Sequence, residues 1–103
     1  MSTIKIRSKR NNGKTLIRTL IAHPMEHGRN RDAKTGELIP AHFIQVLMVK
    51  HNDQVIITSQ MGGSISKDPF FAFMFNGGEA GDKITISWVD NLGKTDSAEY
   101  ILK

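Results

Sequence analysis

Three of the four histidines of this chain lie from position 23 to position 42, in a polar, basic segment between strand-like stretches. Two of them, His23 and His27, flank Glu26, and imidazole together with carboxylate is a ligand set that binds transition metals. On a helix, a four-residue spacing brings two imidazoles to one face. Pro24 and Gly28 instead place this segment in a loop, where that spacing does not make the ligands converge. A metal-dependent enzyme using His23, Glu26 and His27 is one hypothesis, and structural or solvent-facing histidines are the simpler interpretation.

The other residues that could do chemistry do not complete a site. His42 and His51 flank a strand-like stretch and would lie about 30 Å apart at about 3.4 Å per residue, so they cannot share a metal ion. No serine stands in a nucleophile elbow. The glycine-rich run Met61-Gly62-Gly63-Ser64 matches neither a P-loop nor a dinucleotide-binding fingerprint, and we interpret it as a flexible turn. We therefore expect no catalytic residue, no bound metal and no cofactor.

The composition excludes several classes of function. The chain of 103 residues has no cysteine, which rules out disulfides, thiolate nucleophiles, iron–sulfur clusters and covalent haem attachment. Its net charge of +4 comes with one Trp and one Tyr, so we expect no nucleic-acid binding. No stretch reaches the ~18 apolar residues of a membrane helix, and the first residues do not resemble a secretion signal. We expect a cytoplasmic chain, or one exported only when another protein carries it.

The hydrophobic pattern has a period of two almost throughout, which predicts strands separated by turns such as Asn11-Asn12-Gly13 and Asn91-Leu92-Gly93. Seven short strands without crossover helices predict an all-β fold, an Ig-like antiparallel β-sandwich that forms a single domain over residues 1–103. The expected strands are Thr3–Ser8, Thr15–Ala22, Ala41–Lys50, Gln54–Gln60, Phe70–Phe75, Lys83–Val89 and Ser97–Leu102.

Two of these stretches lack the polar side that a strand of an antiparallel sandwich normally turns to water. One is Phe70–Phe75. The other is Ala41–Lys50, in which Phe43, Leu47 and Val49 share one face, and we expect these three residues to form a surface that binds a partner protein. The open alternative is that the loop 24–40, or a neighbouring loop, covers the apolar side.

Basic residues alternate along the first expected strand, where Lys5, Arg7 and Lys9 share one face. Lysines on an edge strand discourage edge-to-edge aggregation, so a solvated edge is the simpler interpretation. The alternative is a docking surface for an acidic protein, where such charge mainly raises the rate of association.

Four motifs together give the chain a resemblance to a known family. They are Ile21-Ala22-His23-Pro24-Met25-Glu26, Leu38-Ile39-Pro40-Ala41-His42-Phe43-Ile44, Gly63-Ser64-Ile65-Ser66-Lys67-Asp68-Pro69 and Ile86-Ser87-Trp88-Val89-Asp90-Asn91-Leu92-Gly93. In this order and spacing, nearly end to end, the chain resembles SoxZ, the small subunit of the SoxYZ sulfur-carrier complex of bacterial thiosulfate oxidation. The resemblance departs around Gln60-Met61-Gly62-Gly63, where family members more often carry an aromatic residue before the glycines.

The resemblance implies an Ig-like sandwich with a non-catalytic role in a heterodimer with SoxY. In such a complex SoxY carries the sulfur intermediate on a cysteine near its C-terminus, and other Sox enzymes make transient contact. SoxY has an export signal, so the resemblance implies a periplasmic location for a chain that travels with it. Without SoxY, a homodimer through the apolar face is an expected substitute. A generic Ig-like binding domain is the further alternative.

Overall fold

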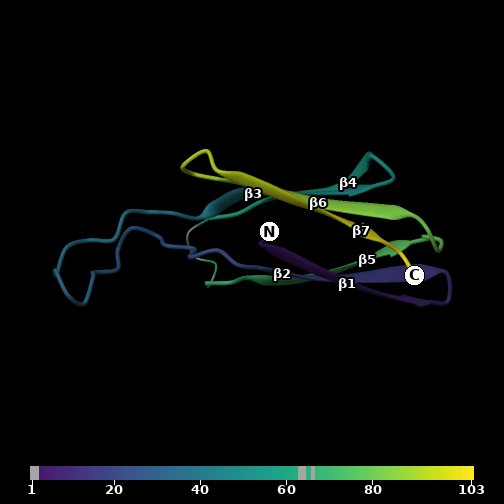
Figure 1. Cartoon of the computed structure of the whole chain (residues 1–103), viewed down its shortest axis with the longest axis horizontal. Helices are drawn as coiled ribbons and strands as arrows, with labels where there is room; N and C mark the ends of the chain where they lie inside the picture. Colours follow the sequence, from purple (N-terminus) through teal and green to yellow (C-terminus); the bar gives the residue numbers. More distant parts are fainter. Residues whose placement is uncertain (1–2, 63–64, 66) are drawn as a thin grey trace.

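The computed structural model describes residues 3–62, 65 and 67–103, and it confirms the expected all-β, Ig-like sandwich. Two antiparallel sheets pack face to face (Figure 1), one in the order β1-β2-β5 and the other in the order β4-β3-β6-β7. No helix in the described part of the chain could cross a membrane. The strands are β1 (Ile4–Asn11), β2 (Lys14–Ile21), β3 (Ile44–His51), β4 (Gln54–Gln60), β5 (Phe70–Asn76), β6 (Lys83–Asp90) and β7 (Thr95–Ile101).

The core lies between the sheets and follows the alternation of the sequence. In β2 the side chains of Ile17 and Ile21 are fully buried, while Arg18 between them points to solvent. From the other sheet, β6 contributes Ile84 and Ile86, which are also fully buried. The expected turns are present: between β1 and β2 the chain reverses through Asn12 and Gly13 with positive φ, the geometry of a two-residue hairpin turn. Gly63 and Ser64 of the glycine-rich run lie outside the described residues.

The expected exposed surface on β3 is corrected by the structure. Leu47 is 3% exposed and Val49 is 0% exposed, because both point into the core, and half-buried Phe43 packs against that core. The physical reason is a register shift between Ile44 and Val46, typical of a β-bulge, which interrupts the strict alternation of the strand. Residues that strict alternation would place on opposite faces therefore share the inner face: Ile44, Leu47 and Val49 are all buried.

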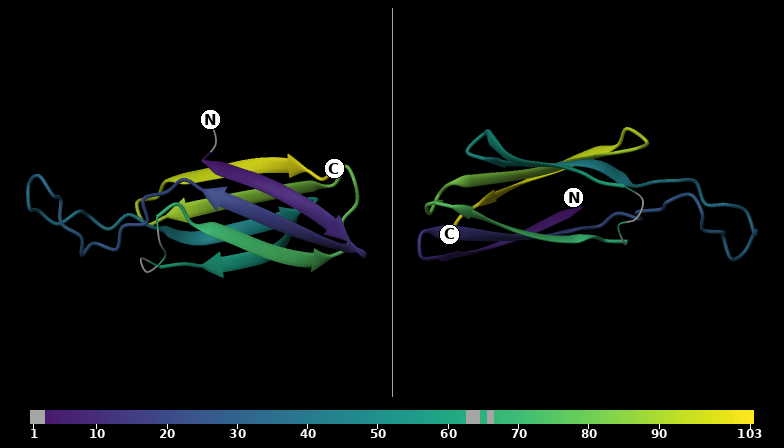
Figure 2. Two further views of the ribbon diagram at one scale, coloured as in Figure 1. Left: turned by 90° about the horizontal axis from the view of Figure 1, so that it is seen from below. Right: turned by 180° about the vertical axis from the view of Figure 1, so that it is seen from behind.

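The segment between β2 and β3, residues 22–43, projects away from the sandwich as a long hairpin (Figures 1 and 2), and we call it the arm. Its two limbs are joined by an isolated bridge between Arg31 and Leu38, and residues 29–38 are all exposed. The arm gives the molecule its elongated shape of 52 × 24 × 22 Å. Beyond its base the arm extends past the ends of the sheets (Figure 2). Of residues 24–40, Met25 at the base is buried and joins the core, so apart from its base this segment does not cover an apolar face.

Candidate functional site at the base of the arm

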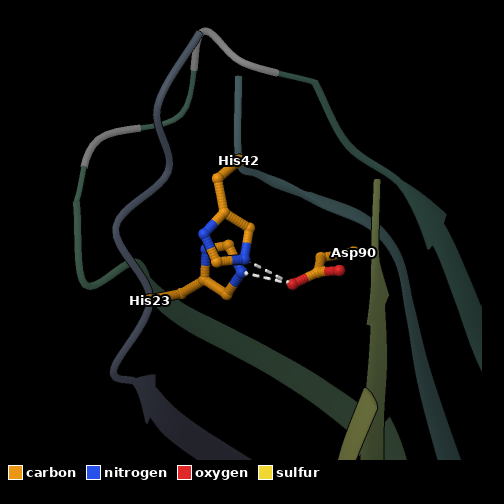
Figure 3. A group of neighbouring side chains, drawn as sticks. All are labelled: His23, His42 and Asp90. Carbon is orange, nitrogen blue, oxygen red and sulfur yellow. Dashed lines mark hydrogen bonds and ion pairs between the residues drawn. The ribbon is translucent and has the colours of Figure 1, made fainter. Parts of the chain in front are cut away.

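Three ionisable side chains from distant parts of the chain meet where the arm leaves the sandwich (Figure 3). His23 lies two residues after β2, His42 lies two residues before β3, and Asp90 ends β6. The Nε2 atoms of His23 and His42 lie 3.1 and 2.7 Å from the same Asp90 oxygen, Oδ2. His23 is 4% and Asp90 1% exposed, whereas His42 is half-buried. The two limbs of the arm are therefore joined through one buried carboxylate, and we call this group the arm clamp.

The proton on His23 is placed by its neighbours. The Nδ1 atom of His23 accepts a hydrogen bond from the backbone amide of Met25, at 3.2 Å. A nitrogen that accepts carries no proton, so the neutral ring carries it on Nε2 and donates it to Asp90. The other carboxylate oxygen, Oδ1, accepts from the backbone amides of Leu92 and Lys94 in the β6–β7 turn. Asp90 thereby joins both limbs of the arm to that turn.

These hydrogen bonds decide the protonation of Asp90. Burial alone would raise the pKa of this carboxyl group, because a low-dielectric environment disfavours the charged form. The hydrogen bonds from His23, from His42 and from the two turn amides outweigh burial and lower the pKa of Asp90 from 3.8 to about 2. Asp90 is therefore a carboxylate at neutral pH, and its charge is matched by four donors.

The arm clamp also has the donor types of a metal centre. One ligand atom from each of His23, His42 and Asp90 can be chosen so that all three lie within 4.8 Å of one another. A metal on Nε2 of His23 would require a neutral ring protonated on Nδ1. That nitrogen faces the Met25 amide, which is itself a donor. Every buried side-chain polar atom among the described residues already has a hydrogen-bond partner, so the arrangement fits a hydrogen-bonded clamp better than a metal site.

Further hydrogen bonds fasten both limbs of the arm beside the clamp. The side-chain oxygen of Asn91 accepts a hydrogen bond from the backbone amide of Phe43 at 2.8 Å, and its side-chain amide donates one to the Ala41 carbonyl at 2.9 Å. Asp68 accepts the backbone amide of His23 at 3.0 Å. The base of the arm is thus held from the β6–β7 turn on one side and from the segment before β5 on the other.

A family model described as sulphur oxidation protein SoxZ matches residues 4–100. The chain belongs to the SoxZ family. No curated protein matches it. Membership places this SoxZ chain in sulfur oxidation. Three of the four motifs that carry the resemblance supply the clamp: His23 comes from the first, His42 from the second and Asp90 from the last, while Asp68 of the third motif binds the His23 backbone.

The residues whose spacing suggested a metal site, His23, Glu26 and His27, do not come together in the structure. His27 is exposed, and its ring nitrogen accepts the Arg29 amide. The carboxylate of Glu26 accepts the side-chain amide of Asn30. Neither lies in the cluster that contains His23.

Sequence reasoning missed the meeting of His23 with His42 and Asp90. The available signal was that each of these residues stands in a family motif directly beside a predicted strand end.

Proposed function

We propose that this SoxZ-family chain is the non-catalytic subunit of a SoxYZ sulfur-carrier complex, in which it binds and supports a SoxY-like protein. The observation that carries the proposal is the absence of cysteine from a chain of a sulphur-oxidation family. Covalent carriage of a sulfur intermediate needs a thiolate nucleophile. A partner must therefore supply the thiol. The arm clamp supports the same conclusion, since its polar groups are occupied in holding the arm.

The location proposed for the complex is the periplasm, where other Sox enzymes would make transient contact with it. This chain would reach the periplasm with a SoxY-like partner that bears the export signal. The family membership supports this proposal, because sulfur oxidation by a carrier requires carrier and partner subunits to work in one compartment.

Co-expression with a SoxY-like protein tests the proposal. We expect a stable 1:1 complex by light scattering after affinity purification through a tag on the partner. Intact-mass spectrometry after incubation with thiosulfate and the cognate Sox enzymes should place the sulfur adduct on the partner and leave this chain at its unmodified mass. Deleting the partner's signal should remove this chain from the periplasmic fraction. Failure to co-purify, or an adduct on this chain, would overturn the proposal.

A further inference from the structure

The outer face of the β1-β2-β5 sheet combines exposed apolar side chains with positive charge, and we call it the basic–apolar face. Alternate residues of the three strands point outward, and the strand register aligns them in rows across the sheet. The three central rows are Lys5–Leu20–Phe70, Arg7–Arg18–Ala72 and Lys9–Leu16–Met74. Positive charge thus lies along β1 and at Arg18 in the middle of β2, and the apolar side chains lie on either side of Arg18 on β2 and along β5.

The apolar part of this face is unusually exposed. Phe70 is 61%, Met74 58% and Leu20 42% exposed. The register places Phe70 beside Leu20 and Met74 beside Leu16, with the row that contains Arg18 and Ala72 between the two pairs. A depression of about 460 Å³ lies beside them, lined in part by Lys5, Leu20 and Phe70. Two such pairs of large hydrophobic side chains on one sheet face, beside a concentration of positive charge, mark an interaction surface.

The outer face of the other sheet mixes polar side chains with smaller apolar ones, and Val55, Val89 and Ile101 of that sheet are exposed. One of its rows, running from β4 to β7, is Thr58–Met48–Ser87–Ser97. Hydroxyl groups fill three of its four positions, as expected for a sheet face that water covers. The basic–apolar face differs from it in its concentration of positive charge and in its larger exposed apolar side chains, Phe70 and Met74.

The charges of the basic–apolar face all have one sign. Its outward positions carry five cations and no carboxylate; the cations are Lys5, Arg7, Lys9, Lys14 and Arg18. Arg7 lies directly opposite Arg18 across the β1–β2 pair, and like charges in that position destabilise a sheet. Neither guanidinium forms a salt bridge to a described residue. A partner that brings carboxylates to this pair would relieve the repulsion, whereas a second copy of this face would add to it.

The free edge of β5 also indicates that another chain covers this part of the molecule. β1, the other edge of this sheet, carries Lys5, Arg7 and Lys9, which protect it against unwanted strand pairing. The edge strand β5 has the sequence FFAFMFN, with neither a charge nor a proline. An unprotected apolar edge next to an exposed apolar face is expected where another chain covers both.

From these observations we infer that the basic–apolar face is the docking surface for a protein partner whose own surface is apolar at its centre and acidic at one margin. This inference rests on the proposed function, and it identifies the partner as the SoxY-like subunit. Apolar contacts on β2 and β5 supply the stability of the complex, and the cations of β1 and β2 set its orientation and its rate of association.

Paired variants of the full chain test the inference, with affinity for the SoxY-like protein measured by surface plasmon resonance. Phe70→Ser with Met74→Ser should weaken binding about a hundredfold, mainly through faster dissociation. Arg7→Glu with Arg18→Glu should slow association at least tenfold and reduce its dependence on salt. Two matched controls should bind as the parent does. One is Val89→Ser on the outer face of the other sheet, and the other is a charge reversal at two exposed cations of the arm, Arg29→Glu with Lys34→Glu.

Hydrogen exchange of the unmodified complex tests the docking surface without relying on variants that could fold poorly. Amides of β5 (Phe70–Asn76) should become protected in the complex. Unchanged affinity of the face variants, or protection restricted to β3 and β4, would overturn the docking surface while leaving the proposed function standing. If the parent chain forms no complex at all, the proposed function fails, and the docking surface fails with it.

Discussion

Replacement of Asp90 by asparagine is the sharpest test of the arm clamp. The side chain keeps its shape, and its carbonyl oxygen can still accept the turn amides, but its amide group now faces His23 and His42. His42 can adapt by presenting an unprotonated nitrogen. His23 cannot, because its Nδ1 accepts the Met25 amide and its proton is therefore on Nε2. One donor then faces another in a site where Asp90 was only 1% exposed.

The size of the effect follows from the hydrogen bonds and from the pKa that they lower. A hydrogen bond to a charged group contributes about 1.5–3 kcal/mol, and the substitution weakens two of them. The pKa of Asp90, lowered from 3.8 to about 2, corresponds to roughly 2–3 kcal/mol of stabilisation at neutral pH. We expect Asp90→Asn to lower the free energy of unfolding by about 3 kcal/mol at pH 7. That is a large share of the 5–15 kcal/mol typical of a domain, yet it leaves the domain folded.

The same linkage predicts the pH dependence. The pKa of Asp90 is lower in the folded than in the unfolded chain, so its contribution is fully present above about pH 4 and is lost as pH falls through about 2. Urea unfolding, followed by the fluorescence of Trp88, the only tryptophan, measures both quantities. Asp90→Asn should lack this acid-sensitive component. The matched control is Asp53→Asn, because the Asp53 side chain is 79% exposed, and it should change stability by less than about 0.5 kcal/mol. A variant at position 90 with parental stability and parental pH dependence would refute the clamp.

Three further perturbations test a close backbone contact, the metal alternative and the tip of the arm. Gly78→Ala should destabilise the domain by about 2 kcal/mol or more in urea unfolding, because φ is +90° and the added Cβ would clash with the Thr15 hydroxyl oxygen. Gly36→Ala, with φ +73° and open space around the added Cβ, should cost about 1 kcal/mol, and equal losses in the two variants would contradict this account. A large excess of Zn²⁺ should shift the thermal unfolding midpoint by less than about 1 °C, because the Nε2 proton of His23 opposes metal binding. A ligand present at 100 times its Kd stabilises the folded state by about 2.7 kcal/mol, so a rise of several degrees would show that the clamp binds metal. Replacing the exposed residues 31–38 with a two-residue turn should change the free energy of unfolding by less than about 1 kcal/mol, and a loss above 3 kcal/mol would show that the arm tip stabilises the sandwich.

Most of the fold could be predicted because its determinants are local. Alternation in β2 identified the buried residues Ile17 and Ile21 directly, and turn residues such as Asn12-Gly13 separated the strands. The failure on β3 has an equally local cause. A bulge changes the side of the strand on which every later residue lies, and nothing in the pattern around Gln45 announces it. Leu47 and Val49 were therefore expected outside when they are in the core.

The arm clamp could not be predicted from spacing, because its members are far apart in sequence. His23 follows β2 of one sheet, whereas His42 precedes β3 and Asp90 ends β6 in the other sheet. Only the three-dimensional pairing of the sheets brings them together. The basic–apolar face was partly visible, since Lys5, Arg7 and Lys9 alternate in the sequence. Its apolar half required the knowledge that β5, and not another strand, pairs with β2.

The clamp explains why three of the family motifs meet at the base of the arm. Connections between strands commonly take about 4–6 residues, whereas the arm spans residues 22–43, and loops of this length usually carry a function. Apolar packing could hold such an arm with equal stability, because a buried ion pair contributes little net free energy after desolvation. Apolar packing does not, however, fix a direction. Four hydrogen bonds that converge on the two oxygens of Asp90 do fix one, because each donor must point at its acceptor within a narrow range of angle. The motifs around His23, His42 and Asp90 therefore determine the direction in which the arm leaves the sandwich. The side chains of its exposed tip are not needed to set that direction.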